Sequence, residues 1–592
     1  MPETKKWILP PEAPADVQKL VDSLRISQAV ARVLVNRGLT DPRAAMGFLQ
    51  PKLNDLTDPC EHAGIVEAAG FLLEASRAGR RISIYGDFDA DGICSAALLE
   101  RCFRFLGANV DFYIPHRVDE GYGLNREAIE ELANGGTEVI VTVDCGISSF
   151  EEVAFAREYG LDVVVTDHHE PGEQIPDATY MLNPKLPGQD FGYKYLAGVG
   201  VAFKLMWAIG QQYSGGPHVT EDFKDLLLEA LALVAIGTIA DVVPLVDENR
   251  ILTQYGLKTL LTAASPGLRE LVPHRHIRGR GVTARDVAFL IAPKLNAAGR
   301  MGEARDAVEM LITDDSETAD MLSNHLEMQN RLRRATQKEA VQKAKSMVEA
   351  SPELQAANCL VLSDSQWHQG VVGLVASRLC DELWRPVFVF VEEDGWARGS
   401  ARSIPGFSLF DAVSRCEDLL ERYGGHAGAA GLTLSMENLP AFTERINAIA
   451  GEMLGTEAPV PELELYGDLP LSALSKAVVL ELERLEPCGR DNPTPMFAAS
   501  GLHAVGYPQI VGSSHLVFWV RQGQTTLRAF GPHRAGQIDE IRARQDESFS
   551  LAFEPYINDY RGESNVELRV QDLQWDSERL FQERGSPPAG AP

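Results

Sequence analysis

The stretch 163-VVVTDHH-169 joins a run of β-branched residues to one carboxylate and two adjacent imidazoles. Apolar residues without polar alternation are typical of a strand that is buried on both faces of a parallel sheet. Asp167, His168 and His169 would then lie at the carboxyl end of that strand. Open α/β sheets bind ligands outside the carboxyl ends of their strands, so this stretch predicts both a fold and a site.

Two other segments of the chain show the same pattern, a predicted buried strand followed by acidic residues. The segment 81-RISIYGDFDADG-92 predicts a strand over 82–85 that is followed by Asp87, Asp89 and Asp91. The segment 138-EVIVTVDCG-146 predicts a strand over 139–143 that is followed by Asp144. Because strands and helices alternate through this region, we predict a doubly wound parallel sheet whose strand ends bring these side chains together.

Each polar group has a simpler interpretation. An aspartate after a strand is often the N-cap of the next helix, and Asp91 alone fits that role equally well. A histidine pair is more often an ordinary surface or core pair. However, several carboxylates that converge without a cation repel one another and lose their hydration. Oxygen ligands mixed with imidazole suit Mn²⁺ or Mg²⁺ better than a structural Zn²⁺, so the pattern predicts a divalent-metal site.

Composition limits the remaining possibilities. A chain of 592 residues predicts three or four domains. Its eight cysteines include no C-x-x-C pair, which fits a reducing compartment and argues against a zinc ribbon. The N-terminus has no cationic, apolar leader, and the longest apolar stretch, 231–240, is about half a membrane span. We therefore expect a soluble, cytoplasmic protein that does not bind membranes.

The net charge of −29 argues against contact with nucleic acid, because the whole surface repels a polyanion. Residues 270–305 depart from this balance, with seven Lys or Arg against three acids. A solvated helix face is the ordinary interpretation of such a run. Glycine and proline among its arginines favour a loop-rich binding surface instead.

The positions of glycine and proline and the hydrophobic periodicity between them predict the order of the domains. Residues 316–351 contain no Gly or Pro, which predicts one helix of about 50 Å with Asp314 or Asp315 near its N-cap. Short strand patterns after residue 456 predict a small β barrel, and an OB-fold would suit single strands. The expected units are a helical lead-in (1–70), a catalytic α/β domain (71–315), a connecting helix (316–352), a second α/β domain (353–455), a barrel (456–578) and a disordered tail (579–592).

A glycine-rich segment, 422-RYGGHAGAAGLTL-434, lies near the end of the second α/β domain. Its glycines would let backbone amides approach an anion closely. A tight turn before a strand is the alternative. His426 within the segment favours phosphate binding.

Four motifs, "GDFDADG", "TVDCG", "TDHH" and "GTIADVVPL", resemble in this order the metal motifs of the DHH phosphoesterase superfamily. A wider set narrows the resemblance to the RecJ family of single-strand-specific exonucleases, over about residues 70 to 575. It consists of "IPHRVDEGYGLN", "LAGVGVAFKL", "APKLNAAGRMG", "WHQGVVGLVASRL", "RGSARS", "GGHAGAAG" and "INDYRG".

The resemblance implies 5′ to 3′ hydrolysis of single-stranded DNA to 5′-mononucleotides, in recombination and repair. Water activated by one or two Mn²⁺ or Mg²⁺ ions would attack the phosphodiester. The implied fold is a parallel-sheet DHH domain, a long helix, a DHH-associated α/β domain that binds phosphate or DNA, and an OB-fold barrel. Expected partners are single-stranded DNA, a helicase and a single-stranded-DNA-binding protein, and the chain is expected to be a monomer.

The resemblance also implies roles for individual residues. Asp89, Asp91, Asp144, His168 and Asp241 resemble direct metal ligands. Asp87 and His169 resemble ligands of lesser weight or supporting groups, and Asp167 would orient the imidazole beside it. Arg117, Ser400 and Arg402 resemble a 5′-phosphate clamp, and Tyr122 is placed to stack on a terminal base. From the basic run, we expect Arg278, Arg280 and Arg300 to line a groove for the strand.

One segment departs from the family pattern. Where the family reads close to F-G-x-G-N-P before its barrel, this chain has 486-EPCGRDNPTP-495. Cys488 and Asp491 stand in place of Phe and Gly. The sequence therefore leaves open how this turn is built and whether the barrel keeps a role in DNA binding.

Two other functions compete with the nuclease. A small-molecule phosphoesterase of the same superfamily would use the same metal site but would scarcely need a charged groove, a long helix and a barrel. A noncatalytic replication scaffold would be expected to lack metal ligands, whereas every carboxylate and imidazole position is filled here.

Overall fold

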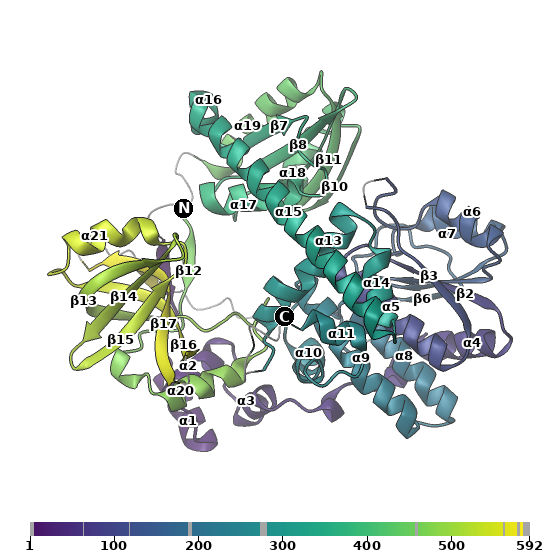
Figure 1. Ribbon diagram of the computed structural model, residues 1–592, viewed down its shortest axis with the longest axis horizontal. Helices are drawn as coiled ribbons and strands as arrows, with labels where there is room; N and C mark the ends of the chain where they lie inside the picture. The colour runs from purple at the N-terminus through teal and green to yellow at the C-terminus, as the bar shows by residue number, and fades with distance from the viewer. Residues whose placement is uncertain are drawn as a thin grey trace.

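The computed structural model describes residues 5–62, 64–117, 119–187, 192–272, 277, 281–455, 460–560, 563–576 and 581–583. Within these residues it contains two five-stranded sheets, one three-stranded sheet and a closed barrel. Helix α15 (Ser316–Ala350) runs between the two larger α/β units, and the barrel lies to one side of them (Figure 1). None of the described helices is long and apolar enough to cross a membrane.

The first large sheet is parallel throughout, in the order β3-β2-β4-β5-β6. Its strands are β2 (Arg81–Gly86), β3 (Asn109–Tyr113), β4 (Val139–Val143), β5 (Asp162–Thr166) and β6 (Tyr180–Leu182). Alternate residues enter different hydrophobic clusters, with Val141 and Val164 on one face and Ile140 and Val163 on the other. The predicted doubly wound sheet is confirmed, and burial on both faces explains why these strands lack polar alternation.

Helices cover both faces of this sheet. One face packs against α4 (Ile65–Arg77), α5 (Ala90–Phe105), α8 (Gly198–Ser214) and α9 (Glu221–Ala240), and the other against α6 (Arg126–Asn134) and α7 (Phe150–Glu158). The first cluster extends to α10 (Asp247–Thr259), α11 (Pro266–Leu271), α13 (Ala292–Met301) and α14 (Arg305–Ile312). The helices of this cluster come from distant parts of the chain, and the cluster also includes residues at the start of α15. It therefore connects the sheet to that helix.

Helix α15 has 35 residues and is about 52 Å long at 1.5 Å per residue. Asp315 is its N-cap, and its side chain accepts a hydrogen bond from the backbone N–H of Thr318 at 2.8 Å. The helix leads into a mixed sheet in the order β10-β11-β9-β8-β7. The strands are β7 (Leu360–Asp364), β8 (Val387–Glu393), β9 (Trp396–Arg402), β10 (Arg422–His426) and β11 (Ala429–Ser435), with α17 (Val372–Leu383) and α19 (Leu439–Leu454) as the main helices.

The predicted β barrel is also confirmed. Its five strands are β13 (Phe497–Val511), β14 (His515–Gln522), β15 (Thr525–Gly531), β16 (Phe549–Tyr560) and β17 (Glu563–Trp575), closed in the order β13-β14-β15-β17-β16. The N-terminal helices α1 (Pro14–Leu24), α2 (Gln28–Asn36) and α3 (Pro42–Leu49) pack in one cluster with the barrel (Figure 1). The two ends of the chain therefore share a hydrophobic core.

A small sheet corrects the expected ends of the chain. Strand β1 (Lys6–Leu9) pairs in parallel with β12 (Glu462–Glu464) and with β18 (Phe581–Glu583). The lead-in is thus not purely helical, and residues 581–583 of the predicted disordered tail form a strand because β1 offers them a free edge. The remaining residues of the predicted tail lie outside the described residues.

The segment that departs from the family pattern forms a tight turn over residues 489–492. The backbone N–H of Gly489 donates to Asn492 O at 2.9 Å, and the N–H of Asn492 donates to Gly489 O at 3.3 Å. Asp491 has φ +58°. Glycine adopts this left-handed conformation without steric cost, and aspartate is one of the few other residues that tolerate it. The turn is therefore formed without the family's glycine.

Candidate metal centre and phosphate-binding groups

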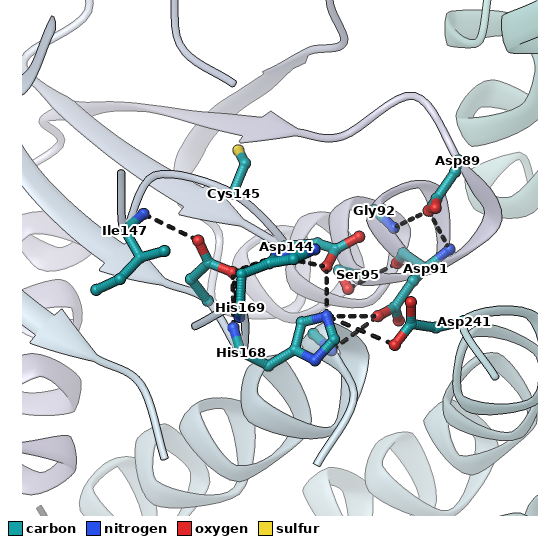
Figure 2. A network of polar contacts seen from close by, with 12 residues as sticks. Asp89, Asp91, Gly92, Ser95, Asp144, Cys145, Ile147, His168, His169 and Asp241 are labelled. Carbon is teal, nitrogen blue, oxygen red and sulfur yellow. Dashed lines mark hydrogen bonds and ion pairs between the residues drawn. The ribbon is translucent and has the colours of Figure 1, made fainter. Parts of the chain in front are cut away.

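The polar residues that follow β2, β4 and β5 lie at one edge of the parallel sheet. These three strands are neighbours in the sheet, so their carboxyl ends are adjacent. Figure 2 shows Asp91, Asp144 and Asp241 directed toward the His168 ring. Asp241 arrives from the opposite direction, as the C-cap of α9. The structure thus brings together side chains that are 150 residues apart in the sequence.

Asp89 and Asp91 have different structural roles at the start of α5. Asp89 is the N-cap, and its carboxylate accepts hydrogen bonds from the N–H groups of Asp91 at 2.8 Å and Gly92 at 3.3 Å. Asp91 is fully buried, and its carboxylate accepts from the N–H groups of Gly198 at 2.7 Å and Val199 at 3.0 Å, at the start of α8. The alternative that Asp91 is the N-cap of the helix that follows its strand is therefore wrong, since Asp89 has that role.

His168 lies at the centre of the carboxylates. Its Nε2 is 3.1 Å from Asp144 Oδ1, 3.5 Å from Asp241 Oδ2 and 3.9 Å from Asp91 Oδ2. Burial and the neighbouring His169 lower the pKa of His168 to about 3. The ring is therefore neutral at physiological pH, which is the state in which imidazole binds a metal ion.

Asp167 forms hydrogen bonds with both histidines. It accepts hydrogen bonds from the backbone N–H groups of His168 at 2.7 Å, Ile147 at 2.9 Å and His169 at 3.0 Å. Its Oδ1 is also 2.8 Å from His169 Nδ1. Burial acts to lower the pKa of His169, but the hydrogen bond and charge of Asp167 outweigh it and raise that pKa to about 9. Tyr122 Oη lies 3.1 Å from the same Nδ1.

We expect Asp167→Asn to weaken Mn²⁺ binding by about 10- to 100-fold, because the partners that hold a metal ligand in place contribute to metal affinity on this scale. Isothermal titration of the metal-free protein with Mn²⁺ measures this effect. Asp162→Asn is the matched control, since Asp162 lies at the opposite end of the same strand, where it pairs with Arg80. Equal Mn²⁺ affinity in the two variants would contradict the orienting role.

Two positions beside the buried carboxylates are glycines, whose lack of a side chain leaves room for the carboxylates. A Cβ atom on Gly198 would lie 2.7 Å from Asp144 Oδ1, and one on Gly237 would lie 2.6 Å from Asp91 Oδ1. Both distances are too short for any side chain. Neither glycine was predicted from the sequence, although both fall within quoted motifs. Their spacing from the aspartates gives no local signal, since each contact joins separate elements of the fold.

The donor set fits a divalent cation. Four buried atoms have no hydrogen-bond partner among the residues that the structure describes: Asp87 Oδ1, Asp144 Oδ1, Asp241 Oδ2 and His168 Nε2. Burial, and then the neighbouring carboxylates, raise the pKa of Asp87, Asp91 and Asp144 well above the ordinary value. Three groups of these residues have ligand atoms within 4.8 Å of one another: Asp87, Asp89 and Asp144; Asp91, His168 and Asp241; and Asp144, His168 and His169. Oxygen with imidazole is a donor set for Mn²⁺ or Mg²⁺.

We expect Mn²⁺ to stabilise the metal-free protein, because the ion would relieve the repulsion among these carboxylates. At a hundredfold excess over Kd, binding to the folded state alone contributes about 2.7 kcal/mol. The midpoint of thermal unfolding should rise by several degrees with Mn²⁺ and fall again with a chelator. Asp144→Ala should abolish the shift, and a shift of equal size in that variant would place the ion elsewhere.

Four arginines gather on the Asp87 and Asp89 side of this site. The guanidinium of Arg117 lies 4.6 Å from the centre of the Phe88 ring. Burial, and then the charges of Arg117 and Arg333, lower the pKa of Arg300 to about 9. Burial and Arg117 likewise lower the pKa of Arg402. Arg333, on α15, has a buried Nε without a hydrogen-bond partner.

The four arginines repel one another, and within the described part of the chain none of them forms an ion pair with a carboxylate. An anion with several oxygens would relieve this repulsion. Sequence reasoning had included Arg117, Arg300 and Arg402 but missed Arg333. It stands in the ordinary basic run of a long helix, so only the packing of α15 reveals its position.

Ser400 and Arg402 lie together near the start of α17. A Cβ atom on Gly373 would lie 3.2 Å from Arg402 Nη2 and 3.5 Å from Ser400 Oγ. The start of this 12-residue helix adds the positive end of its dipole. Ser400, Arg402 and the helix start together have the composition of a phosphate site.

His426 is exposed at the end of β10, where its Nδ1 accepts a hydrogen bond from the N–H of Gly428 at 3.1 Å. It pairs across the sheet with Ala429, which pairs with Arg402, so its backbone is about 10 Å from that of Arg402. Arg278 and Arg280 lie outside the described residues. Of the other basic residues in that run, Lys294 pairs with Glu327 at 3.6 Å and Arg305 pairs with Glu309 at 2.8 Å.

Comparison with known families divides the chain in the same order. Residues 81–238 match the DHH family N-terminal domain, residues 356–452 match the DHHA1 domain, and residues 467–572 match the RecJ OB domain.

The chain is 37% identical to the single-stranded-DNA-specific exonuclease RecJ of Bacillus subtilis over 572 residues, covering 96% of this chain and 71% of that protein. It is 35% identical to the Salmonella typhimurium protein of the same name over 581 residues, covering 95% and 97%. The chain belongs to the RecJ family. RecJ of Thermus thermophilus in complex with Mn²⁺ has a TM-score of 0.82 at 33% identity, covering 98% of this chain and 81% of that one. The same RecJ in complex with Mg²⁺ has a TM-score of 0.75.

Proposed function

We propose that this RecJ family protein is a metal-dependent exonuclease that degrades single-stranded DNA from its 5′ end to mononucleotides, in recombination and repair. One observation supports this most strongly: a buried group of carboxylates and imidazoles lies directly beside arginines that have no carboxylate partner among the described residues. The first group suits a divalent ion, and the second suits a terminal phosphate. An enzyme that acts at an end needs both.

One group of side chains would bind the metal, and another group would bind the substrate. Asp89, Asp91, Asp144, His168 and Asp241 would hold Mn²⁺ or Mg²⁺, with Asp87 and His169 beside them. When bound, such ions lower the pKa of water and neutralise the charge that grows on phosphate oxygens. Asp167 keeps His168 and His169 in place through the backbone hydrogen bonds described above.

The arginine group would set the distance between the strand end and the metal centre. Arg117, Arg300, Arg333 and Arg402 would bind the 5′-phosphate, with Ser400 and the start of α17 supplying further donors. Tyr122, half exposed and hydrogen-bonded to His169, would stack on the terminal base. His426, about 10 Å from Arg402, would contact the same nucleotide. Cleavage would then remove one nucleotide at a time.

The remaining partners are also proposals. The protein would act as a cytoplasmic monomer on strands that a helicase separates and a single-stranded-DNA-binding protein covers. The barrel supports binding of the strand, since OB-folds commonly take single strands in a groove. Light scattering during gel filtration would test the oligomeric state.

Digestion of a long strand labelled at either end tests the function directly. With Mn²⁺, a 5′-phosphorylated strand with a 5′ label should release labelled mononucleotide at once, whereas a 3′ label should stay on long products until late. A chelator should stop both reactions. A protein that cleaves dinucleotides and leaves the long strand intact would instead be a small-molecule phosphoesterase.

A further inference from the structure

The turn at residues 489–492 packs against the segment that follows Asp241, although it belongs to the segment that leads into the barrel. The backbone N–H of Leu245 donates to Arg490 O at 2.9 Å. A Cβ atom on Gly489 would lie 2.7 Å from Leu245 Cδ1, so the turn packs directly on this residue. Leu245 comes only four residues after Asp241. The backbone of Arg490 is therefore held to the segment that carries one of the carboxylates of the centre.

Arg490 presents an uncommitted positive charge there. It is one of the two central residues of the turn and is exposed. Its guanidinium forms no hydrogen bond or ion pair with the residues that the structure describes. The turn thus brings this charge to the segment that follows Asp241, whereas Arg117 lies over the Phe88 ring, between Asp87 and Asp89 in the chain.

The base of the turn is rigid. Asn492 is fully buried, and its Nδ2 donates to Leu485 O at 3.0 Å and Pro487 O at 2.6 Å. Arg250, on α10, donates to Leu485 O at 2.9 Å and to Pro487 O at 3.3 Å. Asn492 thus stabilises the turn internally, while Arg250 and Leu245 attach it to the catalytic domain. The turn would therefore lose little conformational freedom when a residue at its tip contacts the substrate.

We propose that Arg490 binds a phosphate of the DNA strand on the 3′ side of the scissile bond. The proposal rests on the function proposed above. If the arginine group holds the 5′-phosphate beside Asp87 and Asp89, the strand leaves the centre on the side of Asp241, where Arg490 lies. Lys185, which Asn183 links to His169, pairs with Glu170 at 3.1 Å. Arg490 has no such partner among the described residues, and a guanidinium suits phosphate oxygens.

A comparison of long and short substrates tests this inference. On a 5′-phosphorylated 20-nucleotide strand, Arg490→Ala should lower kcat/KM about tenfold and reduce the slope of log affinity against log salt by about one. On a 5′-phosphorylated dinucleotide, which has no phosphate beyond the scissile one, the loss should be less than about twofold. Arg490→Lys should recover part of the activity on the long strand. Arg484→Ala, in the same connecting segment, is the charge-matched control.

Neutral methylphosphonates at single linkages would locate the contact. In the wild-type protein, one substitution within the first linkages beyond the scissile bond should lower kcat/KM, and the same substitution should have no further effect in Arg490→Ala. Additive losses at every linkage would overturn the proposal. So would equal losses on the dinucleotide and the long strand, together with a changed Mn²⁺ dependence, because Arg490 would then act on the metal centre. A wild-type protein that does not degrade the long strand would refute the proposed function instead.

Discussion

Asp144→Ala is expected to lower the rate of strand cleavage by about a thousandfold or more. Asp144 belongs to two of the three candidate ligand groups, and its Oδ1 is the oxygen nearest to His168 Nε2. Removing a shared ligand takes away several kcal/mol of charge stabilisation from the phosphate, and about 4 kcal/mol corresponds to a thousandfold. Single-turnover cleavage of a 5′-phosphorylated strand at saturating Mn²⁺ measures the effect.

Two further variants separate chemistry from folding. Asp144→Asn keeps the shape of the side chain and removes its charge, so it should lose nearly as much activity as the alanine variant. Glu138→Gln is the matched control, because Glu138 precedes the same strand at its opposite end, beside Arg80. Near-normal cleavage by Asp144→Asn, with Glu138→Gln equally active, would show that Asp144 is not a ligand.

Arg402→Ala should lower kcat/KM by roughly thirtyfold on a 5′-phosphorylated strand and only slightly on a 5′-hydroxyl strand. A hydrogen bond to a charged group contributes about 2 kcal/mol when its partner is removed, which corresponds to this factor. A strand without the terminal phosphate never makes the contact, so it has little to lose. The ratio of the two rates is therefore the decisive measurement.

The structure also predicts how Arg402→Ala affects the protein without DNA. Burial and the charge of Arg117 both disfavour the charged form of Arg402, so its removal should not lower the midpoint of thermal unfolding. Arg398→Ala provides the control, since Arg398 lies on the same strand with an exposed side chain and only a distant partner, Glu393 at 3.9 Å. Equal losses on both kinds of 5′ end would assign Arg402 to some other part of the strand.

The metal centre could be predicted from the sequence because of a simple property of parallel sheets. The carboxyl ends of neighbouring strands share one edge, so residues that directly follow buried strands must converge there. Asp87, Asp144 and His168 satisfy this condition. Asp241 does not follow a strand, and only the resemblance of "GTIADVVPL" to a family motif pointed to it. Its approach from the end of α9 is a property of the tertiary structure.

The sequence also determined the order of the α/β units, the long helix and the barrel, because periodicity and helix-breaking residues are local signals. The basic run at 270–305 was less informative. Charge composition cannot show that Lys294 and Arg305 are paired with acids, whereas Arg300 turns toward Arg117.

Only the tertiary structure decided which distant elements meet. It placed Arg333 of α15 near Arg300, the N-terminal helices against the barrel, and Arg490 against Leu245, four residues after Asp241. These contacts depend on how helices and turns pack across domain boundaries, and such packing leaves no periodic pattern near the residues involved. The sequence by itself therefore determined the chemistry of the metal site, while the fold decided which arginine side chains lie around it.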